Sequence, residues 1–415
     1  MAAAAEMSQE PKSSPLRQPV KLADQAFVDA KYAMYARMRE EAPVCRVKMS
    51  GLEMFAVSRY QDCVDLVSDP RLARNRTTAT GKSRFPIPLP KSIKAVGLSM
   101  IVEDDPEHRR LRNMVNRSFR PKAIQSLGGQ VQDFADEMLD SLQPRGRVDL
   151  LSDFCKPIPS AVIARMVGVS PDEMPTFQKS VRVLSDGMTG WNILRTFLWD
   201  IRKAAGFMRD LIHRKKANPG DDILTYLIQE EEEGSRLTED ELVAMLFLLI
   251  LAGFETTTHM IANGVLALLQ HPDQLERLRA EPALIDSAVE EMLRFCGPVH
   301  GSKPAYAIED ITLQGVLIPK GGAVVPMWGA ANHDPDVFEE PERFDITRSP
   351  NHHLAFGHGS HYCLGSQLAK MEVRVAIQTL LERNPDLRLA VEPGDLRLQR
   401  MPFWHRYESM PVLLG

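Results

Sequence analysis

Apolar residues recur at intervals of three and four over much of the chain, which is the pattern of helices that bury one face. Four such stretches are Ala30 to Glu41, Gln130 to Leu142, Ile201 to Ala217 and Pro282 to Cys296. Strand patterns are fewer, at Met54 to Val57, Ile311 to Ile318, Ala323 to Met327, and a C-terminal pair near Leu387 to Val391 and Met410 to Leu414. We therefore expect a mainly α-helical protein with a smaller β-rich region, an α+β fold.

The longest helix is predicted for Thr238 to Gln270. Thr238 and Glu241 have the spacing of a capping box, in which each side chain satisfies a free backbone N–H. The centre of this helix is apolar on all sides, so it should run through the core. The longest apolar run, Leu242 to Phe254, is shorter than the roughly 20 residues of a bilayer span. No membrane span is expected.

Composition and charge exclude several classes of protein. The 415 residues are 44% hydrophobic and 25% charged, with a net charge of −5, which is ordinary globular composition without a basic excess for nucleic acid. Five cysteines without a CxxC pair favour a reducing compartment. Residues 1–22 form an expected flexible tail, because Glu6 interrupts the place of a signal sequence. Residues 23–415 should form a single domain of a cytoplasmic, monomeric protein.

The most informative segment is 356–365, which reads FGHGSHYCLG. Its glycines permit a tight loop and close approach to a flat ligand. A helical pattern from Gln367 to Arg383 begins just after Cys363, and a helix N-terminus favours the thiolate, the form of cysteine that binds metal. Two other interpretations stay open from the residues alone. One is a glycine-rich turn around a buried cysteine, and the other is a zinc site, since four histidines lie near Cys363: His352, His353, His358 and His361.

This segment is similar to the haem-binding loop of the cytochrome P450 family, the haem-thiolate monooxygenases, whose pattern is FGxGxxxCxG. The resemblance implies the P450 fold, with haem b (iron protoporphyrin IX) between the long central helix and the Cys363 loop. It makes Cys363 the axial ligand of the iron, where a thiolate favours O–O cleavage. It also places Phe356, Gly357 and Gly365 against the haem, and His361 at a haem propionate.

The middle of the long helix reads AGFETT over residues 252–257. Glycine costs about 1 kcal/mol relative to alanine inside a helix, so its presence there suggests a local reason. A gap at Gly253 would admit a small ligand, and threonine hydroxyls can bond back to the preceding turn. A polar kink in a packed helix is the plain alternative. The sequence resembles the family's oxygen-activating turn, which implies catalytic roles for Thr256 in oxygen activation and Glu255 in proton delivery, with Ala252 and Gly253 at the haem.

Two further motifs follow the family order. Glu291 and Arg294 lie three apart on a helix and can pair, although such pairs are common on surfaces. The resemblance adds the segment PERF at 341–344 and implies a buried network of Glu291, Arg294 and Arg343 that stabilises the fold.

Upstream, His108 and Arg112 share one face of a predicted helix and can both donate to a carboxylate. Without the other motifs this would be a charged, solvated helix. The resemblance assigns the pair to a haem propionate. Lys303 stands where the family usually has an arginine that binds a propionate. The resemblance implies the same role for Lys303, although its ammonium group offers a point charge and not the two-pronged hydrogen bonding of arginine.

The expected substrate cavity is lined by Leu248, Ala252, Val299 and Met401, which implies a mainly apolar small molecule. The stretch from Arg76 to Val102 contains no acidic residue. It carries basic residues that suggest an anionic or carrier-bound substrate: Lys82, Arg84, Lys91 and Lys94. His300 is interpreted as a structural histidine.

The implied reaction is monooxygenation, by hydroxylation or epoxidation, with O₂ as co-substrate. No GxGxxG nucleotide motif is present, so NAD(P)H electrons should arrive through a ferredoxin and its reductase, or a flavodoxin-type donor. A basic cluster could help an acidic partner dock: Arg109, Arg110, Arg112, Lys370 and Arg374. Two alternatives remain: the same fold acting as a peroxygenase or oxidative-coupling enzyme, and a non-catalytic haem-based sensor.

Overall fold

The computed structural model describes residues 16–49, 51–82, 99–119, 121–179, 201–232 and 234–415. Its longer helices are α2 (Lys31–Glu41), α3 (Tyr60–Ser68), α6 (Glu107–Ser118), α7 (Pro121–Leu142), α8 (Pro157–Met166), α11 (Ile201–Ala217), α13 (Glu239–Gln270), α14 (Pro272–Ala280), α15 (Ile285–Cys296) and α17 (Ser366–Arg383). Shorter ones are α1 (Gln25–Asp29), α4 (Arg76–Thr80), α12 (Ile223–Gln229) and α16 (Trp328–Ala331). The expectation of a mainly helical α+β fold is confirmed.

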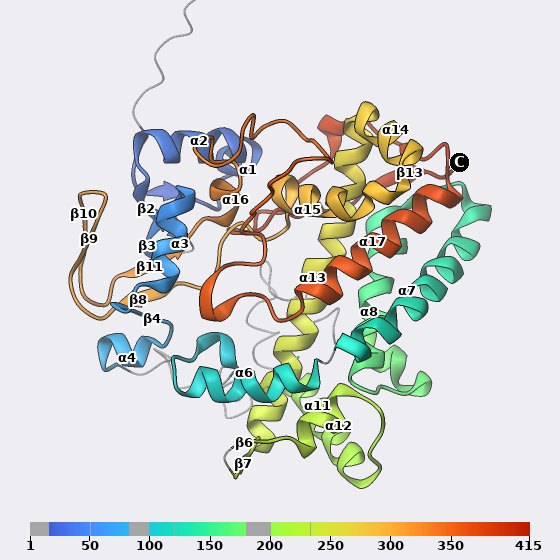
Figure 1. Cartoon of the computed structure of the whole chain (residues 1–415), viewed down its shortest axis with the longest axis horizontal. Helices are drawn as coiled ribbons and strands as arrows, with labels where there is room; N and C mark the ends of the chain where they lie inside the picture. The colour runs from blue at the N-terminus through green and yellow to red at the C-terminus, as the bar shows by residue number, and fades with distance from the viewer. Residues whose placement is uncertain (1–15, 50, 83–98, 120, 180–200, 233) are drawn as a thin grey trace, which may run out of the picture.

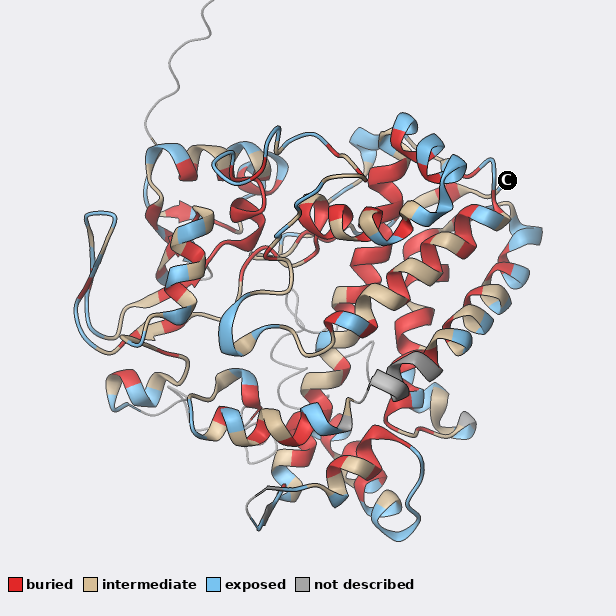
Figure 2. Ribbon diagram, viewed as in Figure 1, coloured by how far each residue is buried: buried red, intermediate tan, exposed pale blue. Residues whose placement is uncertain are grey.

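Helix α13 is the central element of the helical half of the molecule (Figure 1). Thr238 caps it in a complete capping box with Glu241, as the spacing predicts. It packs against α8, α15 and α17, and most of its side chains are buried (Figure 2). Among the described residues it is the one helix long and apolar enough to cross a membrane, but 67% of its most apolar window is buried inside the fold. Its apolar surface therefore belongs to the core.

The other half of the molecule is built on a six-stranded sheet. Its strand order is β1 (Val20–Lys21), β2 (Val44–Met49), β3 (Leu52–Val57), β11 (Ala323–Pro326), β8 (Ala305–Ala307) and β4 (Leu72–Ala73). Strand β11 runs parallel to β3 and antiparallel to β8, so the sheet joins the N-terminal part of the chain to residues 305–326. Strand β4 ends just before Arg74, and β8 begins shortly after Lys303, so the sheet brings these two residues close together.

Smaller β elements complete the fold. The predicted C-terminal pair is present as β12 (Arg388–Leu389) and β13 (Pro411–Leu413), joined by β5 (Arg147–Asp149). Two hairpins are formed by β6 (Glu231–Glu232) with β7 (Ser235–Arg236) and by β9 (Ile311–Leu313) with β10 (Val316–Ile318). The single strand predicted for Ile311 to Ile318 is therefore wrong. Gln314 and Gly315 both have positive φ angles, 46° and 76°, which turn the chain back on itself.

The tail expected over residues 1–22 also needs correction at its end. Val20 and Lys21 form β1 and pair with Val47 and Lys48 of β2. Val20 and Leu22 are buried in a core cluster with α1 and α2. Their apolar side chains gain burial against the sheet, so the ordered fold includes residues before position 23.

Candidate active site

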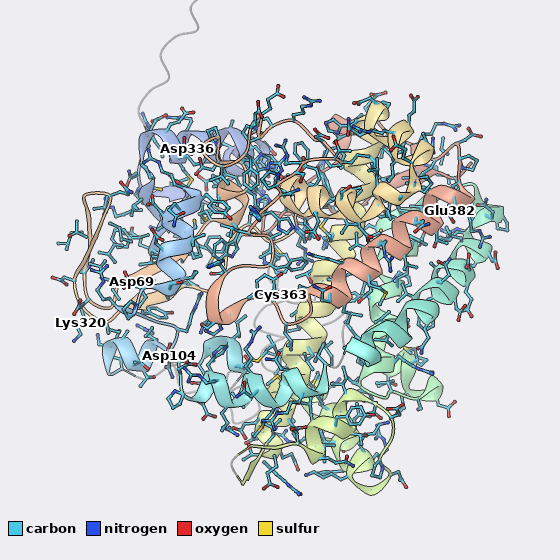
Figure 3. The ribbon with its side chains drawn as sticks, viewed as in Figure 1. Asp69, Asp104, Lys320, Asp336, Cys363 and Glu382 are labelled. Atoms are coloured by element: carbon cyan, nitrogen blue, oxygen red, sulfur yellow. The ribbon has the colours of Figure 1, made fainter. Side chains whose placement is uncertain are left out.

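The Cys363 loop leads directly into α17 in the middle of the molecule (Figure 3). Gly357 and Gly359 have φ angles of 73° and 74°, a conformation that side chains other than glycine rarely adopt. The backbone N–H of Cys363 donates to the carbonyl of Phe356 at 2.9 Å, which closes the loop. A Cβ added at Gly365 would meet no atom within 4 Å, so the loop faces open space beside Cys363.

The electrostatics at Cys363 differ from the simple helix-terminus expectation. Helix α17 begins at Ser366, with Gly365 as its N-cap. Burial raises the pKa of the Cys363 thiol, while the Gly365 N–H and the Arg112 guanidinium act in the opposite direction. Burial outweighs these two contributions. A bound cation at the sulfur is what would stabilise the thiolate there.

Cationic and neutral nitrogen donors converge next to this loop. Arg112 donates to the carbonyl of Tyr362 at 2.7 Å, and the rings of His108 and His361 lie 4.0 Å apart. Burial, reinforced by the charges of His108, Arg74, Arg112 and Lys303, lowers the pKa of His361 to about 3. We refer to Arg74, His108, Arg112, Lys303 and His361 as the cation cluster.

The cation cluster has the chemistry of a carboxylate-binding site. His108 is buried, its Nδ1 lies 3.3 Å from Asp105, and its Nε2 has no hydrogen-bond partner among the described residues. Buried nitrogens of this kind require an acceptor. The four predicted members therefore come together. The sequence gives no signal for the fifth member, Arg74. Its side chain donates to the carbonyl of Lys303, which is 229 residues away in the chain.

On α13, an accessible stripe of side chains interrupts the buried surface. Leu248, Ala252 and Thr256 are spaced four apart and all remain accessible, although the flanking turns are buried. The hydroxyl of Thr256 donates to the carbonyl of Ala252, the back-bond that the sequence predicts. Gly253 has a different role from the predicted gap for a ligand. A Cβ there would lie 3.0 Å from Ile163, so this glycine permits close packing of α13 on α8.

Glu255 lies on another face of the same helix and is buried. Its carboxylate pairs with Arg406 at 2.6 Å and lies 3.7 Å from His259. Glu255 and Thr256 are thus adjacent in sequence, but the carboxylate is held by the C-terminal part of the chain.

The predicted charge network is present with one member changed. Arg294 binds Glu291 through two hydrogen bonds of 2.8 Å, and both side chains are fully buried. The second arginine at Glu291 is Arg348, at 3.2 Å, instead of Arg343. The side chain of Arg343 is exposed and pairs with Glu340, and only its carbonyl reaches Arg294. The prediction for Arg343 is wrong because its side chain leaves the turn toward solvent.

The remaining cavity predictions fall on neighbouring segments. Val299 forms an isolated β-bridge with Trp404, which brings the Val299 and Met401 segments side by side. His300 is buried, accepts or donates a 3.0 Å hydrogen bond with Tyr35, and stacks on His405, which fits a structural role. Arg84, Lys91 and Lys94 lie outside the described residues.

The zinc interpretation of the histidine-rich segment finds no support in the part of the chain that the structure describes. Within it, no three His, Cys, Asp or Glu side chains converge as metal ligands. His353 instead bonds Glu290 at 2.9 Å.

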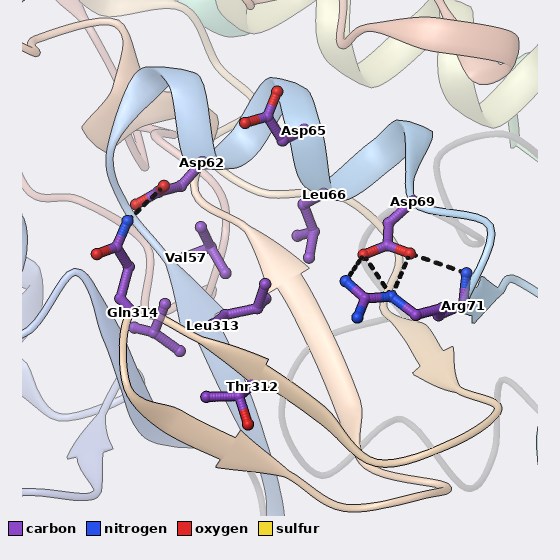
Figure 4. Close-up of a pocket in the computed structure, with 10 residues that line it drawn as sticks. Val57, Asp62, Asp65, Leu66, Asp69, Arg71, Thr312, Leu313 and Gln314 are labelled. Atoms are coloured by element: carbon purple, nitrogen blue, oxygen red, sulfur yellow. Dashed lines mark hydrogen bonds and ion pairs between the residues drawn. The ribbon is translucent and has the colours of Figure 1, made fainter.

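Two surface hollows are described. A cleft of about 540 Å³ is bordered by Arg74, His108 and His361 of the cation cluster. A smaller one of about 210 Å³ lies between α3 and the β9–β10 hairpin (Figure 4). There Asp69 binds Arg71 at 2.7 Å and Asp62 accepts from Gln314 at 2.9 Å. No member of the cation cluster borders the smaller hollow, so the larger one belongs to the candidate site.

Comparison with known proteins agrees with this geometry. The sequence model described as "Cytochrome P450" matches residues 24–384. The chain belongs to the cytochrome P450 family. Its relatives include cytochrome P450 107B1 of Saccharopolyspora erythraea, 39% identical over 94% of this chain and 97% of that protein. The P450 family implies haem iron and the use of O₂.

Solved structures of P450 enzymes superimpose on most of the chain. The bacillaene polyketide synthase cytochrome P450 PksS of Bacillus subtilis has a TM-score of 0.89 at 35% identity, covering 95% of this chain and 99% of PksS. P450BioI in complex with an acyl carrier protein that bears hexadec-9Z-enoic acid has a TM-score of 0.85 at 34% identity, covering 94% and 99%. The protein is thus a cytochrome P450 monooxygenase, an oxidoreductase with the P450 fold.

Proposed function

We propose that this P450 is a haem b monooxygenase that acts on an apolar substrate with an anionic or carrier-bound end. The observation that carries the proposal is the meeting of Cys363 with the cation cluster, where the buried His108 Nε2 has no acceptor among the described residues. A thiol and several cationic donors side by side match a group that carries both a metal and carboxylates. Phe356, Gly357 and Gly365 shape the loop around it.

Each group of residues has a separate proposed role in the reaction. Haem, when bound, supplies the activation of O₂ and the transfer of one oxygen atom, while the other oxygen leaves as water. Cys363 is the proposed iron ligand, and the cation cluster holds the propionates. Thr256 presents its hydroxyl on the accessible stripe of α13, and Glu255 supplies the proton. Leu248, Ala252, Val299 and Met401 are the proposed substrate contacts. The proposed catalytic domain includes β1 and so begins before residue 23.

Electrons are proposed to come from NAD(P)H through a ferredoxin and its reductase, or a flavodoxin-type donor, in the cytoplasm. The basic residues suggested for docking have acidic neighbours. Arg109 pairs with Asp105, Lys370 with Glu290, and Arg110 with Glu107. In each pair the acidic side chain offsets the positive charge of the basic one. The electrostatic attraction of this surface for an acidic partner should therefore be weaker than the number of basic residues suggests.

The substrate proposal draws on two features. In the middle of α13, from Leu248 to Thr256, the accessible residues are small or apolar apart from Thr256, which suits an aliphatic chain. Among the similar structures, P450BioI binds an acyl chain carried by acyl carrier protein. Hexadec-9Z-enoic acid is therefore a suitable probe. We expect the free acid and the carrier-bound acyl group to bind more tightly than the methyl ester, measured by the shift of the haem absorption. Equal affinity of acid and ester would contradict an anionic recognition site.

The absorption spectrum of the reduced protein with carbon monoxide tests the haem-thiolate assignment. We expect a strongly red-shifted Soret band, because a thiolate opposite carbon monoxide produces it. A haem band without that shift would favour the haem-based sensor. Turnover with peroxide but never with a reductase system would favour the peroxygenase or oxidative-coupling alternative.

A further inference from the structure

A charged and aromatic cluster surrounds the ring of Phe356, the first residue of the Cys363 loop. The ammonium of Lys370 lies 5.5 Å from the centre of this ring, and the His353 and Tyr362 rings lie 6.0 and 6.3 Å from it. A cation within about 6 Å of a ring centre is attracted by the π-electrons. The carbonyl of Phe356 accepts from the N–H of Cys363, so the ring and the thiol belong to one closed loop.

Glu290 of α15 binds two of these neighbours. One carboxylate oxygen pairs with Lys370 Nζ at 2.5 Å, and the other lies 2.9 Å from His353 Nε2. His353 Nδ1 accepts the backbone N–H of Ala355 at 3.2 Å, so this ring donates from Nε2 to Glu290. Both carboxylate oxygens are therefore occupied, and Lys370 is held against the Phe356 ring.

The charges of this pair are only partly open to solvent. The side chains of Lys370 and Glu290 are 26% and 34% exposed. Burial acts to raise the pKa of Glu290, but the hydrogen bonds from His353 and Lys370 outweigh burial and hold that pKa below its ordinary value. Glu290 is therefore a carboxylate at neutral pH, and its negative charge lies beside the positive charge on the Phe356 ring.

Phe356 separates this pair from the proposed metal ligand by apolar material. Its side chain packs against the main apolar core, as Leu364 and Met371 also do. Charges beside such a region interact at a lower effective dielectric constant than charges in bulk water, so they act over a longer distance. The surroundings of a metal site set its reduction potential in this way, through charge and burial beyond the ligands themselves.

We propose that the Glu290–Lys370 pair sets the reduction potential of the haem iron through the Phe356 ring. Reduction adds one electron, supplied by an iron–sulfur or flavin protein, and lowers the positive charge on the iron by one. The Lys370 charge therefore favours the reduced iron, whereas the Glu290 charge favours the oxidised iron. Both are positioning residues that act through Phe356. The inference rests on the proposed ligation of haem by Cys363.

This role differs from the docking role suggested for Lys370 by its place in the basic cluster. A docking residue attracts the partner protein, and its removal changes the salt-dependent rate of association. A residue that sets the potential changes the equilibrium between oxidised and reduced iron when no partner protein is present. Measurements with a small chemical reductant therefore separate the two roles.

The experiment is a redox titration of the holoenzyme with dithionite and mediator dyes, followed by absorption. Lys370→Gln should lower the equilibrium constant for one-electron reduction about threefold, a fall of about 28 mV at about 59 mV per tenfold change. Glu290→Gln should raise this constant by a similar factor, because it leaves the lysine charge unpaired. The variant with both substitutions should return close to the wild-type potential.

Two further variants serve as controls. Lys370→Arg keeps the charge and can stack on the ring, so its potential should stay near that of wild type. Arg374→Gln removes a cation one turn further along α17, where Arg374 lies 3.8 Å from the exposed Asp286. Its potential should change much less than that of Lys370→Gln. The Lys370 series tests the charge by itself should Glu290→Gln fail to bind haem.

The signs of the shifts distinguish an effect of charge from an effect of structure. If Lys370 and Glu290 only keep Phe356 in place, either substitution displaces the ring, and both shift the potential in the same direction. That result would overturn the proposal. An unchanged potential in Lys370→Gln, or an equal shift in Arg374→Gln, would overturn it as well.

The spectrum of the reduced protein with carbon monoxide separates this inference from the proposed function. A red-shifted Soret band in every variant, together with unchanged potentials, would contradict the inference alone. A wild-type Soret band without the red shift would contradict iron ligation by Cys363, and the inference with it.

Discussion

Cys363 is one of five cysteines, and its surroundings set it apart. The other four are buried, and burial raises their thiol pKa values. Burial also raises the pKa of Cys363, but the Gly365 N–H and Arg112 oppose it. The same arginine donates to the carbonyl of Tyr362, the residue before the cysteine, and belongs to the cation cluster. One residue thereby links the proposed metal ligand to the proposed propionate site.

Substitution of Arg112 tests this link. Arg112→Gln should speed the loss of haem about tenfold or more, because a hydrogen bond to a charged group contributes about 1.5–3 kcal/mol. Haem transfer to an acceptor globin, followed by absorption, measures the rate. Arg109→Gln, on the same helix but with an exposed side chain paired to Asp105, is the control and should change little. Equal rates for both variants would remove Arg112 from the propionate site.

Among the elements, α15 is held to the segment 332–351 by a buried ionic contact. Arg294 reaches the carbonyls of Asn332 and Pro341, at 2.9 Å each, in addition to Glu291. Arg348 returns from the end of that segment to the same carboxylate. The segment precedes the Cys363 loop directly. Its attachment to α15 therefore sets where the loop begins.

Three substitutions distinguish the true members of this network. Arg294→Lys should remove most haem incorporation, since breaking a buried pair costs about 3–5 kcal/mol. Arg348→Ala should also lower the free energy of unfolding, by about 1–3 kcal/mol. Arg343→Ala, whose side chain lies at the surface, should stay within about 0.5 kcal/mol. Urea unfolding and haem content measure both effects. Normal holoprotein from Arg294→Lys would contradict a structural role for the network.

At the scale of the whole molecule, the sheet half and the helical half meet at a group of buried histidines. Burial is the main cause that lowers the pKa of His405 to about 3 and that of His300 well below 6.5. Burial likewise raises the pKa of Glu372 on α17 to about 8. In the mildly acidic to neutral range these groups are uncharged in the folded protein. Folding stability therefore depends on pH through these buried residues.

For His300, the direction in which folding stability changes with pH follows from the protons bound by the folded and unfolded states. Below about pH 6.5 the unfolded chain protonates this histidine while the folded protein does not, so stability falls as pH falls. Between pH 6.5 and 5.5 one such histidine removes about 1 kcal/mol. Glu372 acts in the opposite direction in this range, because only the folded state keeps its proton.

Chemical unfolding of the holoprotein at several pH values isolates this contribution. His300→Phe should make the pH dependence shallower by about 1 kcal/mol per unit below pH 6.5. Tyr35→Phe removes the hydrogen bond to His300 but keeps the imidazole, so it should lower stability at every pH without changing the slope. An unchanged slope in His300→Phe would show that this residue becomes protonated in the folded state.

The sequence by itself determined what depends on short spacings. The capping box at Thr238, the back-bond of Thr256 and the Glu291–Arg294 pair all join residues three or four apart, which helix geometry brings together without help from the rest of the chain. The FGHGSHYCLG segment likewise contains its own turn residues and its cysteine. These local features were enough to indicate the family and the main site.

The tertiary structure alone decided the long-range partners. Arg74 lies 229 residues from Lys303, Arg406 lies 147 residues from His259, and Arg348 lies 57 residues from Glu291. Contacts at such separations exist only after distant parts of the chain have paired in the sheet and packed around α13. A side chain's direction out of a loop, as with Arg343 and Arg348, depends on the packing around it. No periodicity in the sequence records that packing.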